Sequence, residues 1–253
     1  RASELKKAIE ESKKITIKSV KESERKLKPK SPFTTASLQQ TAYSSLGFSV
    51  KQTSSVAQRL YQGVALDGDE VTGLISYMRT DSTNLSDECL KDINSFLDKN
   101  HPNLSYGEVR KYQKKIKNAQ EAHEAIRPTQ IDLTPEKIKG FLDDQESKLY
   151  ELIWKRTVAS QMKDAVYNQV SMELELNNKY LFKYSGSYLK DYGFKKVYDL
   201  SDNSQKEDNK KILEKLKTND VLDIKEVKTE QKFTQPPPRY NQASLIQALE
   251  ELG

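Results

Sequence analysis

A tyrosine, an arginine and an aspartate stand two residues apart within residues 73–83 (GLISYMRTDST). Tyr77, Arg79 and Asp81 share one face if this segment is extended, because alternate side chains of a strand point the same way. A tyrosine phenol, with an ordinary pKa of ~10, becomes a nucleophile at neutral pH only when nearby cations stabilise its phenolate. The Arg79 guanidinium can do this, bind a phosphate through two hydrogen bonds, or stabilise a phosphoryl transition state. The alternative is structural: an edge-strand tyrosine that packs beside a surface arginine.

A histidine and a second arginine follow in residues 121–129 (EAHEAIRPT). The segment begins like the zinc motif H-E-x-x-H, but Arg127 stands where the second histidine is required, so we exclude zinc. His123, with an ordinary pKa of ~6.5, can donate to a phosphate or relay a proton. The alternative is that His123 and Arg127 satisfy carbonyl groups at the end of a helix.

Two other features suggest metal or thiol chemistry only weakly. Asp67-Gly68-Asp69-Glu70 contains a D-x-D pattern, but it lies between two glycines and not on a buried strand, so we predict a solvated turn and no metal site in this chain. Cys89 is the only cysteine and can form neither an internal disulfide nor, alone, a zinc site.

The elements that must position these residues change in kind along the chain. Spacing of apolar residues, capping residues, glycines and prolines predicts them. The expected elements are a strand at 14–21, helices at 35–46 and 53–62 that end at Gly47 and Gly63, a strand at 71–79, a helix capped by Ser86, helices at 119–126 and 145–162, and a helix that starts at Thr134-Pro135. Residues 105–118 are rich in lysine and are expected to be mobile.

Beyond Lys163 the apolar period changes from helical to two. The pattern predicts a hairpin with its turn at Asn177-Asn178, a solvated loop over 201–211, a strand over 220–227, and an amphipathic helix capped by Asn241. The order is therefore a strand, a helical block, a sheet and a new helix. This order predicts a β domain that is interrupted by a helical block.

The composition favours an open protein of several lobes. Of 253 residues, 35% are hydrophobic and 31% are charged, and the net charge is +5. Residues 1–31 hold eleven Lys or Arg against five Asp or Glu, which suits either phosphate binding or a merely solvated strand. The sequence contains neither a membrane-spanning run nor a signal-peptide core, so we expect a cytoplasmic location. We also expect both ends to be cuts in a longer protein.

At this point the sequence resembles a known family, the type IA DNA topoisomerases. Residues 73–83 resemble the family's active-site segment, and Met78 fits the bacterial topoisomerase I branch. The resemblance covers about residues 14–253. The other matching segments, in order, are 31–40 (SPFTTASLQQ), 56–61 (VAQRLY), 121–129 (EAHEAIRPT), 148–155 (KLYELIWK) and 243–250 (ASLIQALE).

The resemblance implies a role for each candidate residue. Tyr77 is implied to be the nucleophile that forms a 5′-phosphotyrosyl link to DNA, and Arg79 to stabilise the scissile phosphate. His123 is implied to lie near the cleavage site, where it binds DNA or manages a proton. Asp81 is implied to supply a supporting hydrogen bond, and Arg127 a phosphate contact.

The resemblance also implies an α+β multidomain fold that forms part of a toroid. Residues 1–36 and 164–236 are then two parts of a β arch, 37–163 is a mostly helical insertion that carries Tyr77, and 237–253 begin another helical domain. The family's Mg²⁺ ligands lie in a Toprim domain outside this chain. No ligand set for the ion is expected within these residues.

The function that the resemblance implies is ATP-independent relaxation of negative supercoils: one strand is cut, a strand passes through the gap, and the cut is resealed. The partner is single-stranded or underwound DNA, no membrane is involved, and the protein is expected to be a monomer. The isolated chain is expected not to relax DNA. The alternatives are a non-catalytic single-stranded-DNA-binding module, and a recombinase or type IB enzyme, whose Arg/His cluster the motif order does not supply.

Overall fold

The computed structural model describes residues 2–66, 71–112, 123–198 and 212–252, and these residues fall into two compact units. The first unit comprises 2–27, 165–192 and 212–237. The second comprises the described parts of 28–164 together with 193–198 and 238–252. None of the described helices has the length and apolar character that a bilayer span requires.

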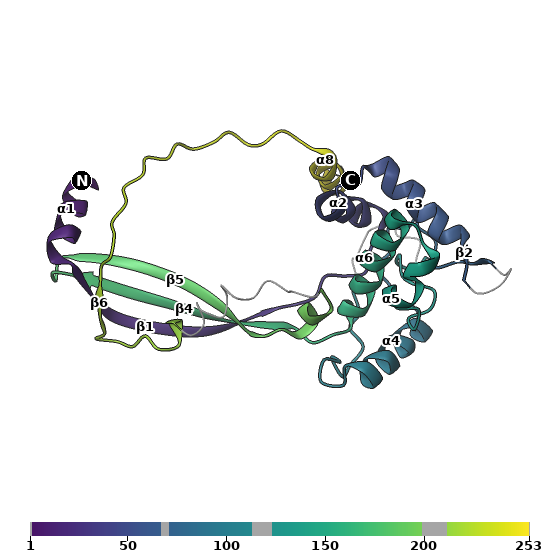
Figure 1. The fold of residues 1–253 in the computed structure, drawn as a ribbon, viewed down its shortest axis with the longest axis horizontal. Coiled ribbons are helices and arrows are strands. Elements are labelled where there is room, and N and C mark those ends of the chain that lie inside the picture. Colours follow the sequence, from purple (N-terminus) through teal and green to yellow (C-terminus); the bar gives the residue numbers. More distant parts are fainter. Residues whose placement is uncertain (1, 67–70, 113–122, 199–211, 253) are drawn as a thin grey trace. The chain divides into compact units, whose positions relative to one another are not determined.

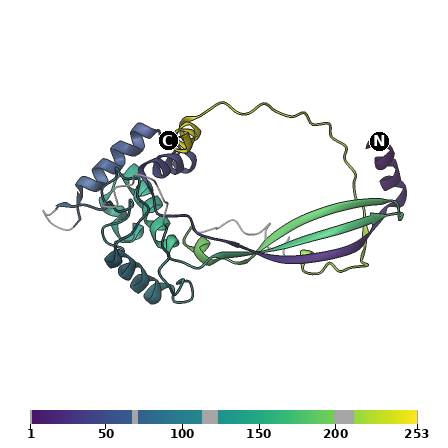
Figure 2. The same cartoon turned by 180° about the vertical axis from the view of Figure 1, so that it is seen from behind.

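The first unit is an antiparallel sheet with the strand order β5-β4-β1-β6. Three strands are long and lie side by side (Figures 1 and 2). The strands are β1 (Lys14–Leu27), β4 (Ala165–Leu176), β5 (Tyr180–Asp191) and β6 (Val221–Asp223). The predicted hairpin is confirmed: Asn177 and Asn178 turn the chain with φ of 53° and 55°, a conformation that asparagine tolerates better than most residues.

The core of this unit is small. Ile17, Val170, Met172, Tyr188 and Leu213 form it. The predicted strand at 14–21 is present and continues to residue 27, while the strand predicted over 220–227 is limited to β6. The helix α1 (Ala2–Ser12) was not predicted from the sequence, and it carries two exposed Lys–Glu pairs one helical turn apart.

The second unit is mostly helical. Its helices are α2 (Thr35–Leu46), α3 (Val50–Gln62), α4 (Asp87–Asn100), α5 (Pro135–Ile138), α6 (Asp144–Ser160) and α8 (Gln242–Leu252), with 3₁₀ turns η1 (Lys139–Phe141) and η2 (Gly193–Tyr198). All the helices predicted around these positions are present, apart from that over 119–126, of which the structure describes only residues 123–126. The combination of this helical unit with the sheet confirms the α+β class.

Local capping explains most helix boundaries. The side chains of Thr34, Ser49 and Ser86 each accept a hydrogen bond from the backbone N–H three residues on. Gly47 ends α2 in the left-handed region (φ 71°), as predicted, whereas Gly63 ends α3 at φ 103° and ψ 167°, a different positive-φ conformation. The Ser49 cap starts α3 three residues before the predicted position.

The helix α6 forms the centre of the second unit's core. Leu149, Ile153 and Trp154 are buried as predicted, and Leu152 is half-buried. The Trp154 indole Nε1–H donates to the Ile131 carbonyl oxygen at 2.9 Å, so the ring is buried without an unpaired donor.

Two predicted elements are wrong over the residues that the structure describes. The strand expected over 71–79 is limited to β3 (Val71–Thr72), paired with β2 (Val64–Ala65), and an isolated bridge between Ile75 and Pro128. The described end of the expected helix, residues 123–126, is extended. There the Ala125 and Ile126 N–H groups donate to the carbonyls of Asn84 and Phe33, so contacts between distant segments override alanine's helix propensity.

Four predictions lie wholly or partly outside the described residues. These are the turn at 67–70, the loop over 201–211, and the parts of the 105–118 and 119–126 predictions that fall within 113–122. Of the lysine-rich segment, residues 105–112 are described, and the Tyr112 hydroxyl donates to the carbonyls of Pro29 and Ser160 at 3.1 and 3.0 Å.

Candidate active site

The segment that follows Ile75 presents alternate side chains to solvent although it is not a regular strand. Met78 and Thr80 point inward and are 6% and 8% exposed. Tyr77 between them is 43% exposed, and Arg79 and Asp81 are also exposed. The three side chains singled out by their spacing are therefore all available to a ligand.

The first turn of α2 holds one side of this segment. The Thr35 hydroxyl donates to the Met78 carbonyl at 2.8 Å and accepts from the Thr80 N–H at 2.9 Å. The Thr35 N–H in turn donates to the Thr80 carbonyl at 2.8 Å. These bonds fix the backbone on both sides of Arg79.

The segment that carries His123 holds the other side. The Ser76 N–H donates to the Arg127 carbonyl at 2.8 Å, and the Arg127 N–H donates to Ser76 Oγ at 2.9 Å. The Ser76 hydroxyl donates to the Ala125 carbonyl at 2.7 Å. Two segments about fifty residues apart in the sequence are thereby joined immediately before Tyr77.

The Tyr77 ring lies near two other aromatic rings. The Tyr77 and His123 ring centroids are 6.5 Å apart with an interplanar angle of 38°. Tyr61, at the end of α3, meets the Tyr77 ring edge-on with centroids 5.5 Å apart. Tyr61 was not singled out from the sequence, and its only signal was its place at the end of the matching segment 56–61.

The Arg127 guanidinium is occupied within the protein. It pairs with Glu124 Oε2, at 2.8 Å from Nε and 2.7 Å from Nη2, and Nη1 donates to the Pro128 carbonyl at 2.9 Å. The other Glu124 oxygen accepts from the Ser86 N–H at 2.7 Å, at the start of α4. Partial burial raises the pKa of Glu124, but the hydrogen bonds from Ser86 and Arg127 outweigh it and hold this pKa below its ordinary value.

Arg79, Asp81 and His123 converge on one open hollow of about 350 Å³. The remaining lining residues are Thr34, Thr35, Ala36 and Thr80. The structure thus brings Tyr77, Arg79, Asp81 and His123 to one surface, with Arg127 behind them. An anion seated beside Arg79 and His123 lies next to an exposed phenol, which is an arrangement suited to phosphoryl transfer.

The described residues do not gather into a metal site. Within the described part of the chain, no three His, Cys, Asp or Glu side chains come together to hold an ion. Asp67 and Asp69 lie outside the described residues. We therefore derive no chemical step through a metal ion.

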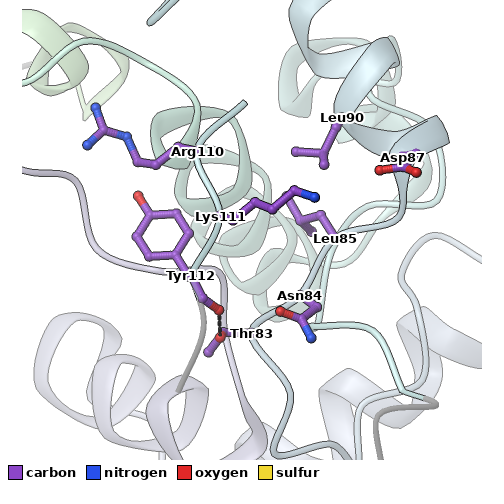
Figure 3. Close-up of a pocket in the computed structure, with 8 residues that line it drawn as sticks. All are labelled: Thr83, Asn84, Leu85, Asp87, Leu90, Arg110, Lys111 and Tyr112. Atoms are coloured by element: carbon purple, nitrogen blue, oxygen red, sulfur yellow. Dashed lines mark hydrogen bonds between the residues drawn. The ribbon is translucent and has the colours of Figure 1, made fainter. Parts of the chain in front are cut away.

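A separate hollow of about 260 Å³ lies beside the start of α4 (Figure 3). It lies between two chain segments, and the Thr83 hydroxyl of one donates to the Tyr112 carbonyl of the other at 2.8 Å. Burial raises the pKa of the Tyr112 phenol to about 12, so this tyrosine remains neutral. None of the residues predicted to act in catalysis lines this hollow.

Comparison with known proteins gives a consistent result. A family model described as DNA topoisomerase matches residues 1–253. Similar curated proteins include DNA topoisomerase 1 of Rickettsia typhi, 47% identical over 243 residues, with coverage of 95% of this chain and 31% of that protein. DNA topoisomerase 1 of Helicobacter pylori is 41% identical over 254 residues, with coverage of 100% and 33%. The chain thus spans about a third of the length of these relatives.

A solved structure resembles the whole chain. Full-length topoisomerase I from Thermotoga maritima superimposes with a TM-score of 0.82 and 35% sequence identity. The match covers 100% of this chain and 40% of the Thermotoga chain. At this identity the similarity concerns both fold and sequence.

Proposed function

The chain belongs to the bacterial type IA DNA topoisomerases, and on that premise we propose that it is the strand-cleaving part of an ATP-independent enzyme that relaxes negative supercoils. The observation that supports this most directly is the exposed Tyr77 phenol beside the His123 ring, next to the hollow lined by Arg79. The proposed cycle cuts one strand, passes a strand through the gap and reseals the cut.

The cutting step exchanges one phosphoester for another. Tyr77 Oη attacks the phosphorus of a DNA phosphodiester, and the bond from phosphorus to the 3′ oxygen breaks. The phenol loses its proton and the departing 3′ oxygen gains one, which leaves a 5′-phosphotyrosyl ester and a 3′-hydroxyl. Resealing is the same exchange in reverse, so the ester conserves the bond energy and no nucleotide cofactor is consumed.

The neighbouring residues have distinct proposed roles. Arg79 binds the scissile phosphate and offsets the charge that develops on it, and His123 donates to the phosphate or carries a proton. Asp81, in the same hollow, accepts a supporting hydrogen bond from DNA or from a neighbouring side chain. Arg127 contacts a phosphate only if its pair with Glu124 opens, and until then it positions the segment that carries His123.

The wider organisation is also a proposal. We place residues 1–36 and 164–236 in a β arch, 37–163 in an inserted domain that carries Tyr77, and 237–253 at the start of a further helical domain. Mg²⁺ ligands are placed elsewhere in the full-length protein, which acts as a monomer on single-stranded or underwound DNA in the cytoplasm. The isolated 253-residue chain is expected not to relax a supercoiled plasmid, which a relaxation assay with Mg²⁺ tests.

The decisive experiment identifies the residue that becomes esterified. The full-length enzyme that contains this chain is trapped during turnover on single-stranded DNA, digested, and analysed by mass spectrometry for a nucleotide remnant on Tyr77. Tyr77→Phe is expected to abolish the adduct. Tyr61→Phe, the matched control, removes a hydroxyl from the adjacent ring and is expected to retain it. An adduct on another residue, or its persistence in Tyr77→Phe, contradicts the proposal.

A second function has one observation in its favour. Tyr61 and Tyr77 are both exposed and in contact, and exposed aromatic rings are a common platform on which single-stranded bases stack. A DNA-binding module without catalytic activity could bind single-stranded DNA through such stacking alone. If Tyr77→Phe in the full-length protein keeps full strand cleavage, the nucleophile lies elsewhere. If Tyr77→Ala then also weakens DNA binding, this second function is the correct one.

A further inference from the structure

A second hollow, of about 240 Å³, lies between α2 and α3 and borders the segment that carries Tyr77 at Met78 and Arg79. Arg79 lines this hollow as well as the one that contains His123 and Asp81. The remaining lining residues are Thr35, Leu38, Gln39, Thr53, Ser54, Ala57, Gln58 and Met78. A phosphate bound by Arg79 would therefore lie beside both hollows.

The lining of the α2–α3 hollow suits a flat, uncharged group. Leu38 and Ala57, each 2% exposed, and Met78, 6% exposed, supply buried apolar surface. The Gln39 and Gln58 amides add groups that both donate and accept hydrogen bonds. Arg79 is the only charged residue in the lining. The hollow therefore fits a neutral ring that is covalently joined to an anion at Arg79.

From this geometry we infer that the α2–α3 hollow binds the base of the nucleotide whose 5′-phosphate is held at Arg79. This inference rests on the proposed function. In the cleaved state the phosphate esterified to Tyr77 is still joined to the nucleotide that follows the cut, and its bond to the preceding nucleotide is broken. The base of the nucleotide that follows the cut therefore stays beside Arg79. A volume of about 240 Å³ is below the ~300–1,000 Å³ of pockets for drug-sized ligands, which suits a single base.

Hydrogen bonds connect the α2–α3 hollow to the segment that carries Tyr77 and Arg79. Thr35, which lines it, binds the backbone on both sides of Arg79. Gln39 Nε2 donates to Ser54 Oγ at 3.1 Å, which links the amide on α2 to α3. A base seated there is read by an oriented amide, since glutamine amides discriminate between base edges. The consequence is a preference for certain bases immediately after the cut.

The test compares two short 5′-phosphorylated single-stranded oligodeoxynucleotides that differ only in the first nucleotide, which is intact in one and abasic in the other. Binding to this 253-residue chain is measured by fluorescence anisotropy. Loss of the first base is expected to weaken binding about tenfold, the scale of one base bound against protein. Removal of the last base instead is expected to have little effect.

Two serines on α3 provide matched variants. Ser54 and Ser55 are adjacent and exposed, but only Ser54 lines the hollow. Ser54→Trp fills the hollow and is expected to abolish the difference between the two oligonucleotides. Ser55→Trp, which adds the same ring to the neighbouring position, is expected to preserve it. Equal thermal unfolding midpoints for the two variants establish that both remain folded.

The possible results separate this inference from the proposed function. If neither oligonucleotide binds, if both bind equally to the unmodified chain, or if the two tryptophan variants behave alike, the base subsite is wrong. None of these results bears on the phosphotyrosyl adduct, which is measured separately in the full-length enzyme. If the adduct is absent from Tyr77 while the first base still matters, the subsite belongs to a DNA-binding surface without cleavage.

Discussion

Ser76 and Arg127 exchange two hydrogen bonds: the Ser76 N–H donates to the Arg127 carbonyl at 2.8 Å, and the Arg127 N–H donates to Ser76 Oγ at 2.9 Å. This pair joins the segment that carries Tyr77 to the segment that carries His123. The distance between the Tyr77 and His123 rings therefore depends on a serine that makes no contact with the reacting atoms.

Ser76→Ala removes one acceptor and one donor, because the hydroxyl also donates to the Ala125 carbonyl. We expect a loss of about 1–3 kcal/mol in the free energy of unfolding, since backbone groups are left without partners. We also expect slower DNA cleavage with nearly unchanged DNA affinity. Chemical denaturation and single-turnover cleavage in the full-length enzyme measure the two effects.

The control for this variant is Ser55→Ala, at an exposed position on α3. It is expected to leave both stability and cleavage unchanged. Equal effects of the two substitutions would show that the Ser76 hydroxyl does not position the site.

Arg79→Ala removes the cation that faces the two hollows. We expect the cleavage rate to fall about 10²–10³-fold, the usual consequence of losing one transition-state donor. Lys51→Ala, which removes an exposed cation from α3, is the control for general loss of positive charge. A cleavage rate that changes equally in both variants would remove Arg79 from the site.

Glu124→Gln tests the carboxylate that links Arg127 to the start of α4. Because the pKa of Glu124 lies below its ordinary value of 4.5, its ionised form stabilises the fold above about pH 4.5, and this contribution is lost as the pH falls through the lowered pKa. The thermal unfolding midpoint of the variant is therefore expected to lie below that of the unmodified protein at pH 7. The two midpoints should converge in acid.

Glu11→Gln is the control, because Glu11 and Lys7 form an exposed i,i+4 pair on α1. Exposed pairs of this kind contribute little, so a small difference is expected at either pH. A difference for Glu124→Gln that stays constant from pH 7 into acid would contradict the role of its charge.

Gly63→Ala tests the turn that follows α3 and precedes the segment that carries Tyr77. Gly63 has φ 103°, and a Cβ there would lie 2.7 Å from the Thr72 carbonyl carbon. We expect a loss of about 2 kcal/mol or more in the free energy of unfolding. Gly140→Ala, where a Cβ meets nothing within 4 Å, is expected to change stability by less than about 1 kcal/mol. Denaturant midpoints of the two variants provide the comparison.

The sequence by itself determined the family and most helix boundaries. Caps such as Ser86 and Asn241, and the glycine that ends α2, act within a few residues, so their effect is readable from local order. The alternation that exposes Tyr77, Arg79 and Asp81 is equally local. The hairpin turn at Asn177-Asn178 follows from the change of period around it.

Only the tertiary structure decided how the site is assembled. The alanine-rich segment at His123 is extended because Ala125 and Ile126 donate to the carbonyls of Asn84 and Phe33, which no local pattern shows. No local pattern shows the edge-on contact of Tyr61 with Tyr77 either, which brings the end of α3 against the segment that carries Tyr77. Contacts between residues far apart in the sequence depend on how the whole unit packs, and propensity and spacing carry no information about them.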